Sequence, residues 1–229
     1  MLDTVPIMAK TKLTQASSSA LEGATAEQMQ WLTDSLLTIV VVGASGDLAK
    51  KKTYPSLLNL YGDGLLPDDT VIWGYARSQM TDEALRDRLR PYLVKAGTHS
   101  EETIEKFLQI CRYQGGSSYG DVDAFASIRK AMEEKEASIT GLLGYNRLFY
   151  FAIPPNVFAE TGLAIKKTCM QDEDKGWTRL IVEKPFGRDL QSFEVRFFII
   201  SGLVLAESLH RSNCVTHRSV RVIRSSTEP

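Results

Sequence analysis

The sequence predicts an α/β fold, a doubly wound Rossmann-like parallel sheet, over residues 36–194. Short apolar runs of strand length alternate with longer amphipathic segments from residue 36 to residue 190, as in a sheet with helices on both faces. The first run, LLTIVVV at 36–42, is apolar and mostly β-branched, which is typical of a strand covered on both sides. Two glycines then separate this run from a segment with helical spacing, which predicts a strand–turn–helix unit.

The first half of the alternation predicts two strands and three helices. Residues 48–60 have helical spacing, with Pro55 either early in the helix or at a kink. A stretch dense in turn formers precedes a strand at 70–76. Thr81 is a plausible N-cap for a helix at 81–95 that continues past Pro91, and a serine with acidic residues opens another helix at 100–108.

The second half predicts three strands and two helices. A short strand at 110–114 precedes a glycine- and serine-rich turn, and residues 123–135 are helical by spacing. The apolar run at 147–153 is a strand that ends at two prolines, and a helix follows at 157–170. The last expected strand is 178–182. We therefore expect a Rossmann domain at 36–194, an N-terminal extension at 1–35 and a divergent tail at 195–229.

Composition excludes several classes of protein. With 43% hydrophobic residues in 229, the chain can bury a core, and a net charge of −1 gives no sign of nucleic-acid binding. The three cysteines are far apart in sequence, which favours a reducing compartment over a disulfide framework or a metal site. No apolar run reaches membrane-spanning length and the N-terminus lacks a signal-peptide core, so we expect a cytoplasmic protein.

The glycine turn is the first candidate site. A strand, a glycine turn and a helix aim backbone N–H groups and the positive end of the helix dipole at one point, which suits a phosphate. The spacing is a variant of the dinucleotide fingerprint with alanine in the third position. The residues expected to hold the phosphates are Gly43, Ala44, Ser45, Gly46, Asp47, Leu48, Ala49 and Lys50.

Two further candidates follow strand ends, where ligands bind in open parallel sheets. Arg77 follows the second strand, where an arginine can pair with the 2′-phosphate of NADP and an acidic residue would favour NAD. Lys184 lies between Glu183 and Pro185 after the last strand, as a fixed cation for cofactor or substrate. A surface arginine and a solvated lysine are the structural alternatives.

At this point the chain resembles glucose-6-phosphate dehydrogenase. The resemblance covers about residues 36–194 and rests on GASGDLAKKK (43–52), DGLLP (63–67), GYARS (74–78), RLFY (147–150) with two following prolines, and IVEKPFGRDL (181–190). It implies NADP as cofactor and oxidation of glucose 6-phosphate at C1 to a lactone, the entry to the pentose phosphate pathway. It also implies that residues 43–50 cradle the cofactor phosphates, that Arg77 takes the 2′-phosphate and that Lys184 touches substrate and cofactor.

The sequence departs from the family in two places. Phe158 stands where the family's cofactor pocket often has tyrosine. The family's phosphate-holding stretch and the second domain with its catalytic histidine are not found, so we expect no catalytic base here and an almost inactive isolated chain. Residues 195–229 carry five arginines and no lysine, and we expect poor order there. This tail indicates either a misjoined reading of the gene or a basic surface for a partner.

Two alternatives remain open at this point. Sugar oxidoreductases of the Gfo/Idh/MocA type also combine a dinucleotide loop with a Glu-Lys-Pro turn, and an NADP-binding module without catalysis would share the same fold. The resemblance implies homodimers or homotetramers for family members, and we do not expect that assembly of this chain alone. The expected small-molecule partner is glucose 6-phosphate, bound weakly at best, with no nucleic acid, membrane or metal.

Overall fold

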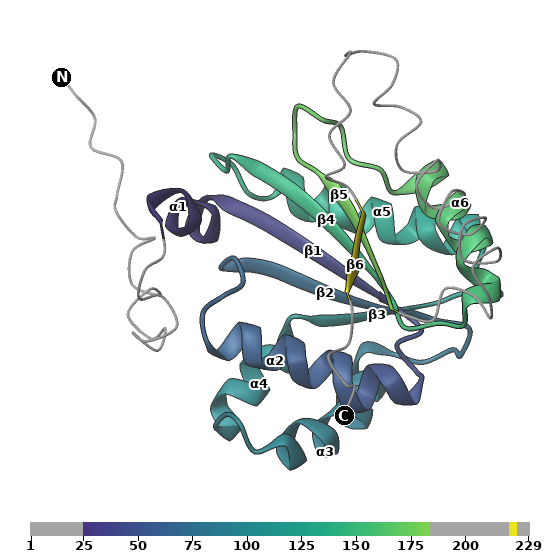
Figure 1. Cartoon of the computed structure of the whole chain (residues 1–229), viewed down its shortest axis with the longest axis horizontal. Helices are drawn as coiled ribbons and strands as arrows, with labels where there is room; N and C mark the ends of the chain where they lie inside the picture. The colour runs from purple at the N-terminus through teal and green to yellow at the C-terminus, as the bar shows by residue number, and fades with distance from the viewer. Residues whose placement is uncertain (1–24, 184–219, 224–229) are drawn as a thin grey trace.

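A computed structural model of the chain describes residues 25–183 and 220–223, which form a parallel sheet between two layers of helices (Figure 1). The strand order is β3-β2-β1-β4-β5-β6, and all neighbouring pairs are parallel. The strands are β1 Ser35–Val42, β2 Asp69–Ala76, β3 Cys111–Gly115, β4 Gly144–Phe151, β5 Thr178–Glu183 and β6 Val220–Ile223. The predicted α/β doubly wound fold is confirmed.

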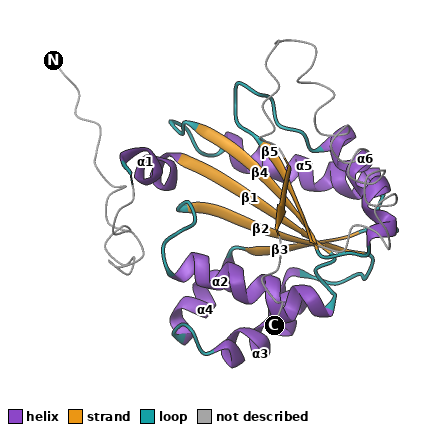
Figure 2. Ribbon diagram, viewed as in Figure 1, coloured by secondary structure: helices purple, strands orange, loops and turns teal. Residues whose placement is uncertain are grey.

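Helices cover both faces of this sheet (Figure 2). They are α1 Ala26–Asp34, α2 Tyr54–Gly62, α3 Asp82–Ala96, α4 Glu101–Gln109, α5 Val122–Ala137 and α6 Phe158–Thr168. In Figure 1, α2, α3 and α4 lie on one face, and α5 and α6 lie on the other. All five predicted helices are therefore present, and α1 adds one inside the stretch that we expected to be an extension.

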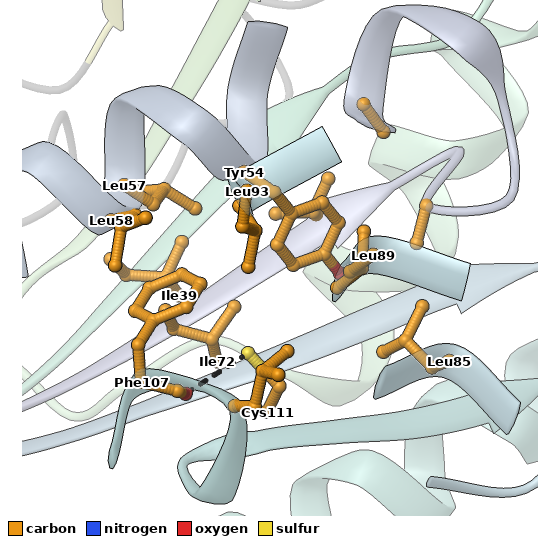
Figure 3. Close-up of a cluster of buried hydrophobic side chains, with 14 of the residues drawn as sticks. Ile39, Tyr54, Leu57, Leu58, Ile72, Leu85, Leu89, Leu93, Phe107 and Cys111 are labelled. Carbon is orange, nitrogen blue, oxygen red and sulfur yellow. Dashed lines mark hydrogen bonds between the residues drawn. The ribbon is translucent and has the colours of Figure 1, made fainter. Parts of the chain in front are cut away.

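Strand β1 is the centre of the fold because it is buried on both faces along its whole length. Ile39 and Val41 point into the core beneath α2, α3 and α4, where Leu58, Leu85 and Phe107 pack around them (Figure 3). Val40 and Val42 point into a second core with Phe125 and Phe149. This alternation between two apolar cores explains why the strand is apolar at successive positions.

Helix caps fix where three helices begin. Thr81 accepts a hydrogen bond from the Ala84 N–H at 3.2 Å, and Ser100 accepts one from the Thr103 N–H at 3.2 Å. Asp121 caps α5 in the same way, at 3.0 Å from the Ala124 nitrogen. Side-chain oxygens at these positions satisfy amides that have no carbonyl partner within the helix. The expected Thr81 cap is confirmed, and α3 continues past Pro91 as predicted.

Pro55 is tolerated because the helix widens just before it. The helix that starts at Asp47 turns as a π-helix over Ala49–Thr53, and α2 continues from Tyr54 with Pro55 in its first turn. Proline has no N–H and its ring clashes with the carbonyl four residues earlier in a regular α-helix. A wide turn relieves that clash, so the Tyr54 N–H bonds to the Ala49 carbonyl five residues back. The sequence suggested an early proline or a kink, and the structure places Pro55 in the first turn of α2 but inside the longer helical run from Asp47, where the π-turn accommodates it.

A buried ion pair links β4 to the ends of α5 and α6. Arg147 of β4 has a side chain only 1% exposed, and its guanidinium nitrogens lie 2.9–3.1 Å from carboxylate oxygens of Glu136 in α5. The same guanidinium donates to the carbonyls of Cys169 and Met170 after α6. Because each partner satisfies the other in a dry environment, this pair is structural.

Strand β6 comes from the segment where we expected poor order. Residues 220–223 pair with β5 in parallel, Leu180 opposite Val220 and Glu183 opposite Ile223. The rest of that segment, and residues 1–24, lie outside the described residues. Among helices that the structure describes, none is long and apolar enough to cross a bilayer.

Candidate dinucleotide-binding site

The glycine turn lies where the strand order reverses. β1 has β2 on one side and β4 on the other, and successive connections run outward from these two strands in opposite directions. In open parallel sheets such a reversal leaves a crevice beyond the carboxyl ends of the strands, and ligands bind in it. The turn at residues 43–46 leaves β1 at this place. The fold therefore puts the predicted phosphate loop at the expected position.

Glycine is required at position 43 for two reasons. Its φ is +92°, a value that residues with a side chain rarely adopt. A Cβ there would also lie 2.8 Å from Cγ2 of Ile153, and nearer still to the carbonyl oxygen of Ala152. The backbone of the turn thus passes directly against the end of β4.

Backbone hydrogen bonds fix the turn to β2. The N–H groups of Gly43 and Ala44 both donate to the carbonyl of Tyr75, at 2.7 and 3.1 Å, and the Gly46 N–H donates to the Gly43 carbonyl at 2.9 Å. Gly74 permits this packing, because a Cβ on it would lie 2.9 Å from the Ala44 Cβ. The turn is therefore held rigidly at its inner side.

The outer side of the turn is open to solvent. Ala44 and Ala49 are buried, whereas Gly46, Asp47 and Leu48 are exposed. The helix begins at Asp47, so the amides of its first turn have no carbonyl partner earlier in the helix. Exposed first-turn amides and the helix dipole together form an anion-binding position.

The three lysines after the turn do not behave alike. Lys50 and Lys51 both pair with Asp47, at 2.9 and 2.8 Å, and the side chain of Lys50 is only 10% exposed. These two ammonium groups lower the pKa of the Asp47 carboxyl from 3.8 to about 2. Lys52 is exposed and pairs with no carboxylate in the described part of the chain.

Arg77 lies beside the turn. It is exposed and stands between Tyr75, whose carbonyl receives the turn's amides, and Ser78, whose hydroxyl is 3.4 Å from that of Ser45. Its guanidinium lies over the ring of Tyr119, with Cζ 5.0 Å from the ring centroid. The structure therefore brings Arg77 together with the glycine turn, as the sequence predicted.

Two buried tyrosines support the loops around Arg77. The hydroxyl of Tyr113 in β3 donates to the Ser78 carbonyl at 2.5 Å, and the hydroxyl of Tyr75 donates to the Ser118 carbonyl at 2.6 Å. Burial raises the pKa of Tyr113 to about 12 and also raises that of Tyr75, so both hydroxyls stay protonated donors. These bonds fix the loop after β2 and the loop that carries Tyr119.

Tyr119 and Ser78 are site residues that the sequence reasoning missed. Tyr119 lies in the loop after β3, and Ser78 directly follows Arg77. The rule that ligands lie beyond the carboxyl ends of parallel strands applies to both loops. The same rule therefore indicates both positions from the sequence.

Two other residues that the sequence singled out, Phe158 and His99, are not part of this site. Phe158 is buried in the core and packs against Phe151, with ring centroids 5.5 Å apart, so its ring is part of the packing between α6 and the sheet. His99 packs over Gly62 at the end of α2, at the opposite edge of the sheet from the turn. Lys184 lies outside the described residues. Within the described ranges, no group of three or more His, Cys, Asp or Glu could hold a metal.

The described residues fit a dinucleotide. The positive φ of Gly43, the exposed first-turn amides and the arginine beside them provide a close backbone approach, a phosphate cradle and a second cationic contact. Chemically, this arrangement can bind and orient two phosphate groups.

Comparison with known proteins gives the family. The family described as "Glucose-6-phosphate dehydrogenase, NAD binding domain" matches residues 40–201. Cytoplasmic glucose-6-phosphate 1-dehydrogenase 6 of Arabidopsis thaliana is 49% identical over 162 residues, and the cytoplasmic isoform of Solanum tuberosum is 49% identical over 161. Both matches cover 69% of this chain and 31% of the relative, so the chain spans about a third of their length.

Comparison with solved structures gives the same family. A glucose-6-phosphate dehydrogenase in complex with its substrate glucose-6-phosphate matches 83% of this chain and 37% of its own, with a TM-score of 0.71 and 34% identity. An enzyme from Mycobacterium avium at 22% identity and a TM-score of 0.63 shares the fold. These matches decide between the two enzyme families that the sequence left open. The chain belongs to the glucose-6-phosphate dehydrogenase family and carries its NAD binding domain.

Proposed function

We propose that this chain is the NADP-binding part of a glucose-6-phosphate dehydrogenase, and that it binds NADP through the glycine turn and Arg77. The observation that carries the proposal is the contact between the turn and the loop after β2, which brings a guanidinium beside the phosphate cradle. In this arrangement residues 43–50 hold the pyrophosphate, and Arg77 pairs with the 2′-phosphate. We propose a domain at 36–194, and Lys184 as the residue that reaches both substrate and cofactor.

Arginine accounts for the preference for NADP over NAD. A charge-assisted hydrogen bond stabilises by about 1.5–3 kcal/mol, and a guanidinium can form two in parallel to a phosphate. NAD has a hydroxyl in place of that phosphate and would need an acidic partner. The stacking of Arg77 on Tyr119 holds the guanidinium plane in one orientation before the ligand arrives.

The whole enzyme's reaction is the NADP-dependent oxidation of glucose 6-phosphate to 6-phosphogluconolactone. NADP, when bound, accepts the hydride from C1 of the sugar. A base must take the proton from the C1 hydroxyl, and histidine is the usual choice near neutral pH. The one histidine in the described part of the chain, His99, lies at the opposite edge of the sheet. We therefore propose that the described part of the chain binds NADP and does not itself supply the base that oxidation of glucose 6-phosphate requires.

The relatives support a cytoplasmic location, since two of them are named cytoplasmic isoforms. Subunit assembly, in the form of homodimers or homotetramers, is proposed for the longer family members.

Calorimetric titration of the intact purified chain with NADP and with NAD tests the proposal. We expect NADP to bind at least tenfold more tightly than NAD, and no reduction of NADP when glucose 6-phosphate is added. Equal affinities for the two cofactors, or no binding of NADP at millimolar concentration, would contradict it.

A further inference from the structure

Asp47 is the first helical residue of a proposed phosphate site, so its carboxylate lies where the helix dipole would also attract a ligand's anion. Its two oxygens each engage a different lysine. Oδ1 lies 2.9 Å from the Lys50 ammonium, and Oδ2 lies 2.8 Å from the Lys51 ammonium. The carboxylate thus neutralises part of the positive charge that would otherwise attract an anion to the helix start.

Lys50 makes this pairing more than a surface contact. Its side chain is only 10% exposed, and its ammonium lies over the Tyr92 ring of α3, 5.5 Å from the centroid. A charged group in so little water needs a partner of opposite charge, and Asp47 is the carboxylate that supplies it. Without Asp47, the Tyr92 ring would be the one group among the described residues that stabilises the charge of Lys50. An incoming anion would then take the place of the Asp47 carboxylate.

We infer that Asp47 is a specificity-determining residue that excludes small inorganic polyanions from the glycine turn. This inference rests on the proposed function, since it concerns the same phosphate site. With Asp47 ionised, the cluster of two lysines and one carboxylate has a net charge of +1, and without it the charge is +2. A ligand that binds by charge alone therefore gains the most affinity when the cluster carries a charge of +2 instead of +1.

A dinucleotide depends less on that charge. Its pyrophosphate is esterified on both sides, so it carries less negative charge than free inorganic pyrophosphate, and Coulomb repulsion by Asp47 scales with the ligand's charge. NADP also carries a 2′-phosphate, which the proposed function pairs with Arg77, and free pyrophosphate has no such third phosphate. Asp47 therefore weakens pyrophosphate more than it weakens NADP, which is a gain in selectivity.

The test is calorimetric titration of the intact chain with inorganic pyrophosphate and, separately, with NADP at low ionic strength. In Asp47→Asn we expect pyrophosphate to bind about fivefold to tenfold more tightly than in the wild type, and NADP to gain by a smaller factor. Raising the salt concentration to about 0.5 M should remove most of the difference, because exposed charges are screened.

Asp172→Asn is the matched control. Asp172 is equally exposed, with 68% of its side chain accessible, and it pairs with Lys175 at 2.7 Å just before β5, at the opposite edge of the sheet. This variant changes the net charge of the chain by the same amount, and its affinity for pyrophosphate should equal that of the wild type. Thermal melting followed by circular dichroism checks that each variant is folded. If Asp47→Asn does not fold, Asp47→Ser removes the same charge and repeats the test.

Four outcomes are possible, and each one supports or overturns the inference. Unchanged pyrophosphate affinity in Asp47→Asn, or an equal gain in Asp172→Asn, would overturn the inference while leaving NADP binding by the wild type intact. A pyrophosphate gain limited to the Asp47 variant supports it. If that gain occurs in a chain that binds no NADP, exclusion by Asp47 is supported and the proposed function fails.

Discussion

The hydroxyls of Ser45 and Ser78 lie 3.4 Å apart, although 33 positions separate these residues in the sequence. Ser45 belongs to the turn after β1, and Ser78 belongs to the loop after β2. Their contact exists because adjacent parallel strands end at the same edge of the sheet. This contact places Arg77, the residue before Ser78, beside the glycine turn. The proposed preference for NADP depends on that placement.

Gly43→Ala should destabilise the chain by about 3 kcal/mol or more, since it adds backbone strain to a clash with β4. Gly97→Ala is the matched control, because Gly97 also has a positive φ, +66°, but a Cβ there would meet nothing within 4 Å. That variant should lose only about 1 kcal/mol from strain. Urea unfolding of both variants measures the difference, and equal losses would show that the contact with the end of β4 is unimportant.

Tyr119→Ala should weaken NADP binding about twofold to fivefold, because an exposed cation–π contact contributes roughly 0.5–1 kcal/mol to holding Arg77 in place. Tyr119→Phe keeps the ring and should bind NADP as the wild type does. Titration with NADP compares the three proteins. If Tyr119→Ala binds normally, the ring does not position the guanidinium.

Asp121 makes stability depend on pH. Hydrogen bonds from the Ser117 and Ala124 amides, together with the Ser117 hydroxyl, lower the pKa of Asp121 below its usual 3.8. Because the folded protein binds this proton less readily than the unfolded chain, the stabilisation is complete above about pH 4–5 and decreases as the pH falls through the lowered pKa.

Asp121→Asn keeps a capping oxygen but loses the charge, so it should be less stable than the wild type at pH 7 by only a few tenths of a kcal/mol, with the difference narrowing as the pH falls below about 4. Urea midpoints across this range measure it. A gap that stays constant with pH would mean that the ionised carboxylate is not what caps α5 and anchors the loop of Tyr119.

Arg147→Met should destabilise the fold by about 3–5 kcal/mol, because it leaves Glu136 partly buried without its partner. Arg129→Met removes an arginine from an exposed pair with Glu133, at 2.7 Å, and should change stability by no more than about 1 kcal/mol. Chemical denaturation of both variants separates the buried pair from the exposed one. Similar losses would show that burial does not set the strength of the pair.

Local pattern was enough to predict the order of strands and helices. Apolar runs, caps and turn formers placed β1, β2 and β5 within one residue of their observed ends, since each reflects burial or backbone geometry nearby. β4 was less well placed. It starts at Gly144, three residues before the predicted start, because pairing of Gly144 with Ser35 extends the strand beyond its apolar core.

Contacts between distant segments could not be predicted in this way. The sequence indicated Arg77 from its place after a strand, but the ring of Tyr119 above it depends on how two loops pack. The distinction among the three lysines likewise depends on the π-turn and on Tyr92 in α3, which turn Lys50 inward. The four-residue strand β6 depends on pairing with β5 across 36 intervening residues that the structure does not describe.

The most direct test of the central claim is titration of Arg77→Asp with NADP and with NAD. If Arg77 pairs with the 2′-phosphate, this change removes the attraction and adds repulsion, so NADP should weaken about 100-fold or more while NAD changes by about threefold at most. Equal losses for the two cofactors would contradict the account, because Arg77 would then not distinguish the phosphate from the hydroxyl.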